Sequence, residues 1–164
     1  MDKHQRLKQG QSGAYQVASQ LLLRGVNLFF PAVDVGADLI TGSGIRIQVK
    51  STYLSSRRSS DFKGGAYWFH FVKYGLENGK RTYARRDFAA ECDVVILWGI
   101  DQNRFWVVPA CELTDCQCLV LGAVPGRVYP NARSAKILAF ENKWDLVASH
   151  DQLIHEPVEE EVNS

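Results

Sequence analysis

The chain of 164 residues is 46% hydrophobic, 11% aromatic and 23% charged, which is typical of a soluble globular protein with one compact core. Nineteen Lys and Arg residues against eighteen Asp and Glu residues give a formal net charge of +1, and this total alone argues against a strongly basic nucleic-acid binder or a polybasic membrane protein. The charge is uneven, because five of the acidic residues lie in residues 151–164, which contain no Lys or Arg. Residues 1–150 therefore hold nineteen basic and thirteen acidic residues, a net charge of +6, and we expect one basic domain there, followed by an acidic, flexible tail over residues 151–164.

Signals for secretion, membrane insertion and structural zinc are weak. Polar residues follow the basic start, where a signal peptide needs an apolar stretch, and no apolar run approaches the roughly 20 residues that cross a bilayer. We therefore expect a cytoplasmic protein. The four cysteines lack the second CxxC or the histidine pair of a zinc site, so we expect reduced and mostly buried thiols at Cys92, Cys111, Cys116 and Cys118.

The first quarter of the chain predicts a helix followed by three strands. Apolar residues between positions 14 and 22 recur with helical spacing after Ser12, a possible cap, and Gly25 is a typical C-terminal stop. Residues 26–30 and 37–41 are β-rich, and the glycine-rich turn at 42–44 leads into residues 45–51, where apolar and polar side chains alternate. We expect residues 1–9 to be loosely held and the three strands to form an antiparallel meander.

The remaining elements predict a mixed α/β fold. An aromatic strand is expected at residues 66–73, and residues 93–99 and 104–109 are expected to pair across the turn at 101–103. A last amphipathic helix is expected at residues 141–149, with Trp144 on its inward side. The aromatic residues Trp98, Phe105, Trp106 and Trp144 are interpreted as core, and His70 as a strand residue rather than a ligand.

Three polar residues on the predicted meander suggest chemistry. Gln48 and Lys50 are two positions apart on one strand and therefore share a face, and antiparallel pairing brings Asp38 of the preceding strand toward them. A carboxylate can hold a divalent cation that polarises a phosphate and activates water, while an ammonium stabilises the developing charge. The alternative interpretation is a solvated strand face on which Asp38 and Lys50 form a simple salt bridge.

At these residues the chain resembles the PD-(D/E)XK nuclease superfamily. Asp38, nine further residues and then Gln48-Val49-Lys50 match its motif in the variant where Gln replaces the usual acid. The resemblance extends over most of the chain through four further segments, GAYQVASQLLLRG, DVGADLI, CDVVILWGIDQNRFWVVP and FENKWDLV. These are similar to the small PD-(D/E)XK endonucleases, which include archaeal Holliday-junction resolvases and some homing endonucleases.

The resemblance implies a restriction-endonuclease-like α/β fold with an αβββαβ core, a central mixed sheet and divalent-metal-dependent DNA cleavage. Asp38 would be the principal ligand of Mg²⁺, for which Mn²⁺ could substitute. Gln48 and the Val49 carbonyl would be further metal ligands, and Lys50 would be the catalytic lysine. Relatives often carry Glu just after the glycine that matches Gly13, where this chain has Ala14.

Another carboxylate precedes the motif. Asp34 either adds a ligand to this set or caps the turn that contains Gly36.

A strongly basic segment follows the motif. Residues 57–86 contain eight basic and two acidic residues, a net charge of +6 that equals the excess of residues 1–150. Such a segment is suited to contacts with phosphate oxygens of double-stranded DNA. The candidate DNA-binding residues are Arg57, Arg58, Lys80, Arg81, Arg85 and Arg86.

The leading hypothesis is a homing- or restriction-like DNA endonuclease with catalytic Asp38, Gln48 and Lys50. Because cutting both strands requires two active sites, we expect a homodimer or homotetramer. The alternatives are a Holliday-junction resolvase, a catalytically inactive DNA-binding module on the same fold, and an interaction domain that binds no nucleic acid.

Overall fold

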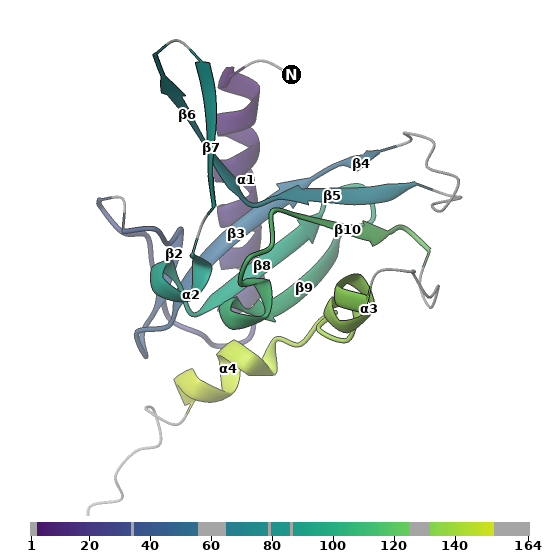
Figure 1. Ribbon diagram of the computed structural model, residues 1–164. Helices are drawn as coiled ribbons and strands as arrows, with labels where there is room; N and C mark the ends of the chain where they lie inside the picture. Colours follow the sequence, from purple (N-terminus) through teal and green to yellow (C-terminus); the bar gives the residue numbers. More distant parts are fainter. Residues whose placement is uncertain are drawn as a thin grey trace, which may run out of the picture.

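The computed structural model describes residues 3–33, 35–55, 65–78, 80–85, 87–124 and 132–152. Its centre is a mixed five-stranded sheet with the strand order β1-β2-β3-β8-β9 (Figure 1). Only the β3–β8 pair is parallel, and the other three pairs are antiparallel. The strands are β1 (Leu28–Phe29), β2 (Leu39–Thr41), β3 (Arg46–Thr52), β8 (Val94–Gly99) and β9 (Arg104–Pro109).

Smaller elements surround this sheet. A second sheet has the order β10-β5-β4, and β6 and β7 form a separate hairpin that projects from the body (Figure 1). These strands are β4 (Leu54–Ser55), β5 (Ala66–His70), β6 (Val72–Glu77), β7 (Lys80–Arg85) and β10 (Cys118–Gly122). The helices are α1 (Lys3–Leu22), α2 (Phe88–Glu91), the 3-10 turn η1 (Ala110–Leu113), α3 (Ala132–Leu138) and α4 (Asp145–Gln152).

The order α1, β1–β3, α2, β8 confirms the αβββαβ core with a central mixed sheet. β4 to β7 are inserted between β3 and α2. A parallel pair needs a crossover connection, and this insertion together with α2 provides it between β3 and β8. The segment that follows the predicted catalytic strand therefore also carries eight of the nineteen basic residues of the chain.

The central sheet has an apolar layer on each face. On one face Val17 and Leu21 of α1 pack with Ile47, Ile96 and other residues of β3 and β8. On the other face, Tyr67 of β5 and residues of β10 and α3 pack against β8 and β9. The aromatic residues predicted to be core are buried, namely Trp98, Phe105, Trp106 and Trp144.

The first helix is longer than predicted. The sequence suggested a start near Ser12 and a loosely held residue range 1–9, but α1 begins at Lys3. Its end agrees with the prediction: Gly25 has φ 80°, and the Val26 N–H donates to Leu21 O at 3.1 Å to close the last turn. The predicted meander of β1, β2 and β3 is likewise confirmed, with Gly44 at φ 90° in the turn.

Two other boundaries differ from the predictions. The aromatic strand ends at His70, and the chain continues into β6, which pairs with β7. The last helix begins at Asp145 rather than at residue 141, because Glu141 accepts two hydrogen bonds from the Arg104 guanidinium, at 2.6 and 2.7 Å. The thiols are free, but only Cys92 and Cys116 are buried. No described helix is long and apolar enough to cross a membrane.

Candidate active site

The turn between β2 and β3 brings a carboxylate and a carboxamide into contact. Asp38 directly precedes β2, and its backbone N–H donates to Ile47 O of β3 at 2.8 Å. One oxygen of the Asp38 carboxylate, Oδ2, accepts a hydrogen bond from the Val49 backbone N–H at 2.7 Å. The same oxygen accepts a hydrogen bond from Nε2 of Gln48. Strand pairing thus places these two side chains together, as the spacing predicted.

Gln48 does not lie on a solvated strand face. Its exposed fraction is 6%, close to those of the apolar neighbours Ile47 and Val49, which are 0% and 7% exposed. A buried carboxamide loses water contacts and is stable only with protein partners. Asp38 Oδ2 is one such partner, and the Val49 carbonyl, 3.4 Å from Nε2, is a weaker one. The alternative interpretation of a solvated strand face therefore does not hold at Gln48.

Lys50 opens onto a cleft of about 290 Å³ beside the start of α1. The lysine is half-buried, and the cleft walls include Gln9, Trp68 and the exposed His70. Lys50 follows Gln48 by two positions on β3, so the two side chains leave the strand on the same face. The strand thus carries a carboxamide in contact with Asp38 and an ammonium at an accessible cleft.

Asp38 lines a neighbouring cleft of about 220 Å³, also beside the start of the helix. Its remaining walls come from α1 and from the segment after β1: Gly10, Gln11, Ala14, Tyr15 and Phe30. Gly10 borders both clefts. The sequence did not identify Gln11, Tyr15 or Phe30 as candidate site residues. Gln11 lies before the predicted start of the helix, and neither aromatic residue belongs to a recognisable motif. The one available indication was the helical spacing of Gly10 and Ala14, which are four positions apart and therefore lie on the same face of a helix.

A reciprocal pair of hydrogen bonds fixes α1 against the strand of Lys50. Gln9 Nε2 donates to Ser51 O at 2.9 Å, and Ser51 Oγ donates to Gln9 O at 3.2 Å. One turn along the helix, Gly13 packs so closely that an added Cβ would lie 3.1 Å from Ser51 Oγ. The side chain next to Lys50 is therefore held from two sides, which limits movement of this part of β3.

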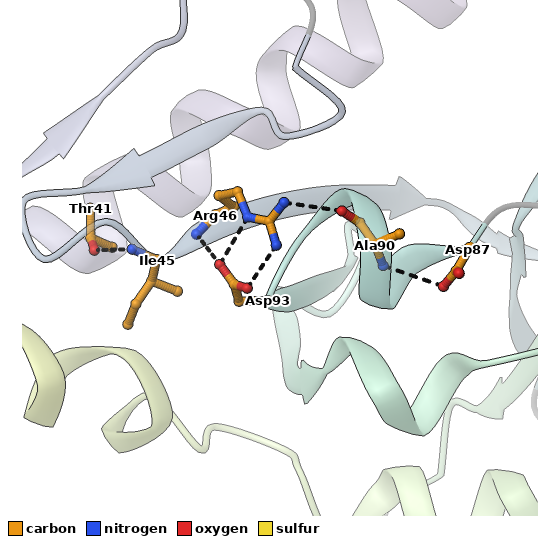
Figure 2. A network of polar contacts seen from close by, with 6 residues as sticks. All are labelled: Thr41, Ile45, Arg46, Asp87, Ala90 and Asp93. Atoms are coloured by element: carbon orange, nitrogen blue, oxygen red, sulfur yellow. Dashed lines mark hydrogen bonds and ion pairs between the residues drawn. The ribbon is translucent and has the colours of Figure 1, made fainter.

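A second polar network holds the start of β3 against the start of β8 (Figure 2). Arg46 donates from Nη2 to Asp93 Oδ1 at 2.9 Å and from Nε to Oδ2 at 3.2 Å, and its backbone N–H donates to Oδ2 at 2.8 Å. Nη1 also donates to Ala90 O at 3.1 Å, and Asp87 caps the same short helix through the Ala90 N–H. The Arg46 hydrogen bond lowers the pKa of Asp93, although burial opposes this, and Asp93 raises the pKa of Arg46.

The oxygen atoms at Asp38 suit a hard divalent cation. Asp38 offers a carboxylate, Val49 a carbonyl and Gln48 a carboxamide oxygen, and Mg²⁺ is commonly held by one or two carboxylates together with waters and substrate phosphates. Within the described residues, no three His, Cys, Asp or Glu side chains form a metal-binding cluster. Asp34, the other candidate carboxylate, lies outside the described residues.

The candidate DNA-binding residues are described only in part. Arg57, Arg58 and Arg86 lie outside the described residues. The backbones of Lys80, Arg81 and Arg85 lie in β7 of the projecting hairpin, but their side chains are not among those that the structure describes. Their role in DNA binding therefore stays a prediction from charge.

Comparison with known proteins shows a likeness in fold. No family model matches the sequence, and no curated protein is significantly similar to it. The structure is similar to that of a bacterial homing endonuclease, I-Ssp6803I, with a TM-score of 0.71 and 15% sequence identity. The match covers 88% of this chain and 94% of that one. The two proteins therefore share the arrangement of nearly all their secondary structure.

Proposed function

We propose that this protein is a divalent-metal-dependent DNA endonuclease of the PD-(D/E)XK type. The observation that carries the proposal is the contact of Asp38 with the buried side chain of Gln48, which lies two positions before Lys50 on the same strand. The fold shared with a homing endonuclease supports DNA as the substrate. The uneven charge supports it as well, because the basic excess of residues 1–150 lies within residues 57–86.

Each residue of the motif has a distinct task in this proposal. Asp38 is the principal ligand of Mg²⁺, or of Mn²⁺ as a substitute, and the Gln48 side-chain oxygen and the Val49 carbonyl complete the protein's share of the ligands. When bound, the ion polarises the scissile phosphate and lowers the pKa of the attacking water. Lys50 neutralises the negative charge that develops on the phosphate oxygens. A homodimer or homotetramer would place one such active site at each strand of the DNA duplex.

Two features also support a second candidate, a DNA-binding module without cleavage. Asp38 is the one acidic residue among those that line the two described clefts, and the amide nitrogen of Gln48, rather than its oxygen, faces Asp38. Gln48 must turn its oxygen toward a metal in the active form. A Holliday-junction resolvase is the other candidate enzyme, and it differs from a homing- or restriction-like endonuclease in that its substrate is a four-way DNA junction.

The test is a cleavage assay with supercoiled plasmid and with a four-way junction, in Mg²⁺, in Mn²⁺ and in chelator. We expect metal-dependent nicking or cutting of the plasmid, whereas preferential cleavage of the junction would favour the resolvase. Lys50→Ala should lower the rate by at least about 100-fold and leave DNA affinity nearly unchanged, because one charge among many phosphate contacts is lost. Salt-dependent binding of both DNAs without cleavage in any metal would leave only the binding module.

A further inference from the structure

Two exposed aromatic side chains stand beside the proposed catalytic carboxylate. Tyr15 of α1 is 65% exposed, and Phe30, just after β1, is 50% exposed. Their ring centroids lie 5.2 Å apart with the planes inclined by 46°. Single exposed aromatic residues are common on protein surfaces, but these two are in contact and share a cleft with Asp38. Folding does not explain why both rings remain accessible next to a functional group.

The cleft that both rings line has the size of a single ring system. Its volume of about 220 Å³ is below the roughly 300–1,000 Å³ of pockets that enclose drug-sized molecules. One wall is aromatic and another carries the Asp38 carboxylate, while Gln11 adds a polar group from α1. A flat apolar surface beside a site for phosphate chemistry matches the two parts of a nucleotide, its base and its phosphate.

The Asp38 cleft and the Lys50 cleft meet at Gly10. An added Cβ at Gly10 would find no atom within 4 Å, so the helix leaves open space where the two clefts adjoin. The same helix carries the exposed Lys8 near its start and contains no acidic residue. This charge is complementary to the phosphates of a strand that passes along the start of α1.

We propose that Tyr15 and Phe30 form a stacking site for one nucleobase, displaced from its pair in the duplex, of the DNA strand whose phosphate lies between Asp38 and Lys50. The inference rests on the proposed nuclease function, which supplies the DNA strand. Aromatic side chains stack on any base, because every base has a π face, so the site fixes the strand without reading its sequence. Gly10 allows the strand to pass from one cleft to the other.

The inference is tested by binding of single strands in chelator, where no cleavage occurs. The probes are a short fluorescent oligonucleotide of mixed sequence and a matched strand of the same length in which every nucleotide is abasic, so that the charge is equal and the bases are absent. Stacking contributes about 1–3 kcal/mol per base, so the wild type should prefer the normal strand by about 5- to 150-fold. Tyr15→Ala combined with Phe30→Ala should abolish this preference while the slope of affinity against salt stays unchanged.

Two matched controls separate stacking from folding. Phe29→Ala removes a side chain that is 61% exposed on the neighbouring strand position but does not line the cleft, and it should retain the preference. Gly10→Leu should fill the passage and weaken binding of the normal strand, whereas Ser12→Leu, an exposed position on the same helix, should not. Melting temperatures check that each variant is folded. Tyr15→Phe, which keeps the ring, should bind like the wild type, and Tyr15→Leu, which keeps apolar bulk without a ring, replaces Tyr15→Ala if the alanine variant unfolds.

The outcomes distinguish this inference from the proposed function. A wild type that cleaves plasmid but binds normal and abasic strands equally would overturn the stacking site and leave the nuclease intact. A base preference that depends on Tyr15 and Phe30, without cleavage in any metal, would keep the stacking site and remove the nuclease. If the paired alanine variant instead loses only oligomeric mass, measured by light scattering, then the aromatic pair is a subunit contact and the inference is wrong.

Discussion

The contact between Gln48 and Asp38 combines burial with a donor that a carboxylate could not provide. Gln48 is 6% exposed, and its amide hydrogen satisfies an oxygen of Asp38 that also receives the Val49 backbone N–H. A carboxylate at the position of Gln48 has no hydrogen to donate when it is ionised, so it would repel the carboxylate of Asp38. Gln48 therefore stabilises the fold without a metal, but it offers less negative charge to the proposed metal than a carboxylate would.

Gln48→Glu should lower the stability of the fold and raise its affinity for a divalent metal. The introduced carboxyl lies beside Asp38 and is buried, so its folded pKa rises above the ordinary value of about 4.3. A raised carboxyl pKa means that the folded state holds the proton more tightly than the unfolded state. The loss of stability is therefore absent at low pH and grows as the pH rises past the ordinary value, to about 1–3 kcal/mol near neutrality. Thermal unfolding between pH 4 and pH 8 measures it.

Magnesium should raise the melting temperature of Gln48→Glu more than that of the wild type, since two carboxylates attract the ion more strongly than one. Gln48→Leu is the matched control, because it removes the donor without adding charge. Its loss of stability should not share this pH dependence or recover in Mg²⁺. Equal melting curves for Gln48→Glu and wild type across the pH range would contradict the contact described for Asp38.

At the scale of elements, strands with clear alternation and turn residues were predictable from the sequence. The glycine-rich turn at 42–44 fixes the β2–β3 hairpin, and the register follows because a slip by one residue would expose Ile47 and Val49. The contact of Asp38 with Gln48 was predictable for the same reason. The pairing of β8 with β9 followed from two apolar runs around a polar turn.

Elements whose stability depends on distant contacts were not predictable. The first turns of α1 are polar and lack an apolar stripe, yet Gln9 is bonded to Ser51, 42 residues away. β10 has no alternating signal and becomes a strand by pairing with β5. The cleft of Tyr15 and Phe30 likewise needs the helix and the segment after β1 to meet, and neither segment alone indicates this.

The Arg46–Asp93 pair gives the parallel β3–β8 contact a pH dependence. Its hydrogen bond with Arg46 holds the Asp93 pKa below the ordinary value of 3.8. A depressed folded pKa contributes stability above the unfolded pKa, and this contribution is lost as the pH falls through the folded pKa. Asp93→Asn should therefore lower the melting temperature slightly at pH 7, since both side chains are partly exposed, and the difference should disappear in acid below pH 3.8.

Arg46→Ala should produce a similar loss at pH 7, and the double variant should be little worse than either single one if the two residues act as a pair. A difference between Asp93→Asn and wild type that persists undiminished at low pH would show that the carboxylate charge is not its source.

On the scale of the whole molecule, charge and fold divide the chain into a compact body and a basic insertion. The body is built on two apolar layers around the central sheet, and the β6–β7 hairpin projects from it (Figure 1). The hairpin strands contain Lys73, Lys80, Arg81 and Arg85 against the single acid Glu77. A projecting two-stranded ribbon adds little to the apolar core, and we therefore expect its charge to serve a function such as DNA binding.

Lys80→Ser combined with Arg81→Ser should weaken DNA binding without affecting the fold. Each lost phosphate contact reduces the slope of log affinity against log salt by about 0.9, so the slope should fall by about two and the loss should be similar for unrelated DNA sequences. Fluorescence anisotropy between about 50 and 200 mM salt measures this, and thermal unfolding should be unchanged. The matched control is Lys136→Ser with Lys143→Ser, which removes two exposed cations near α3 and α4. An equal drop in slope for both pairs would mean that DNA responds to the net charge of the molecule rather than to the hairpin.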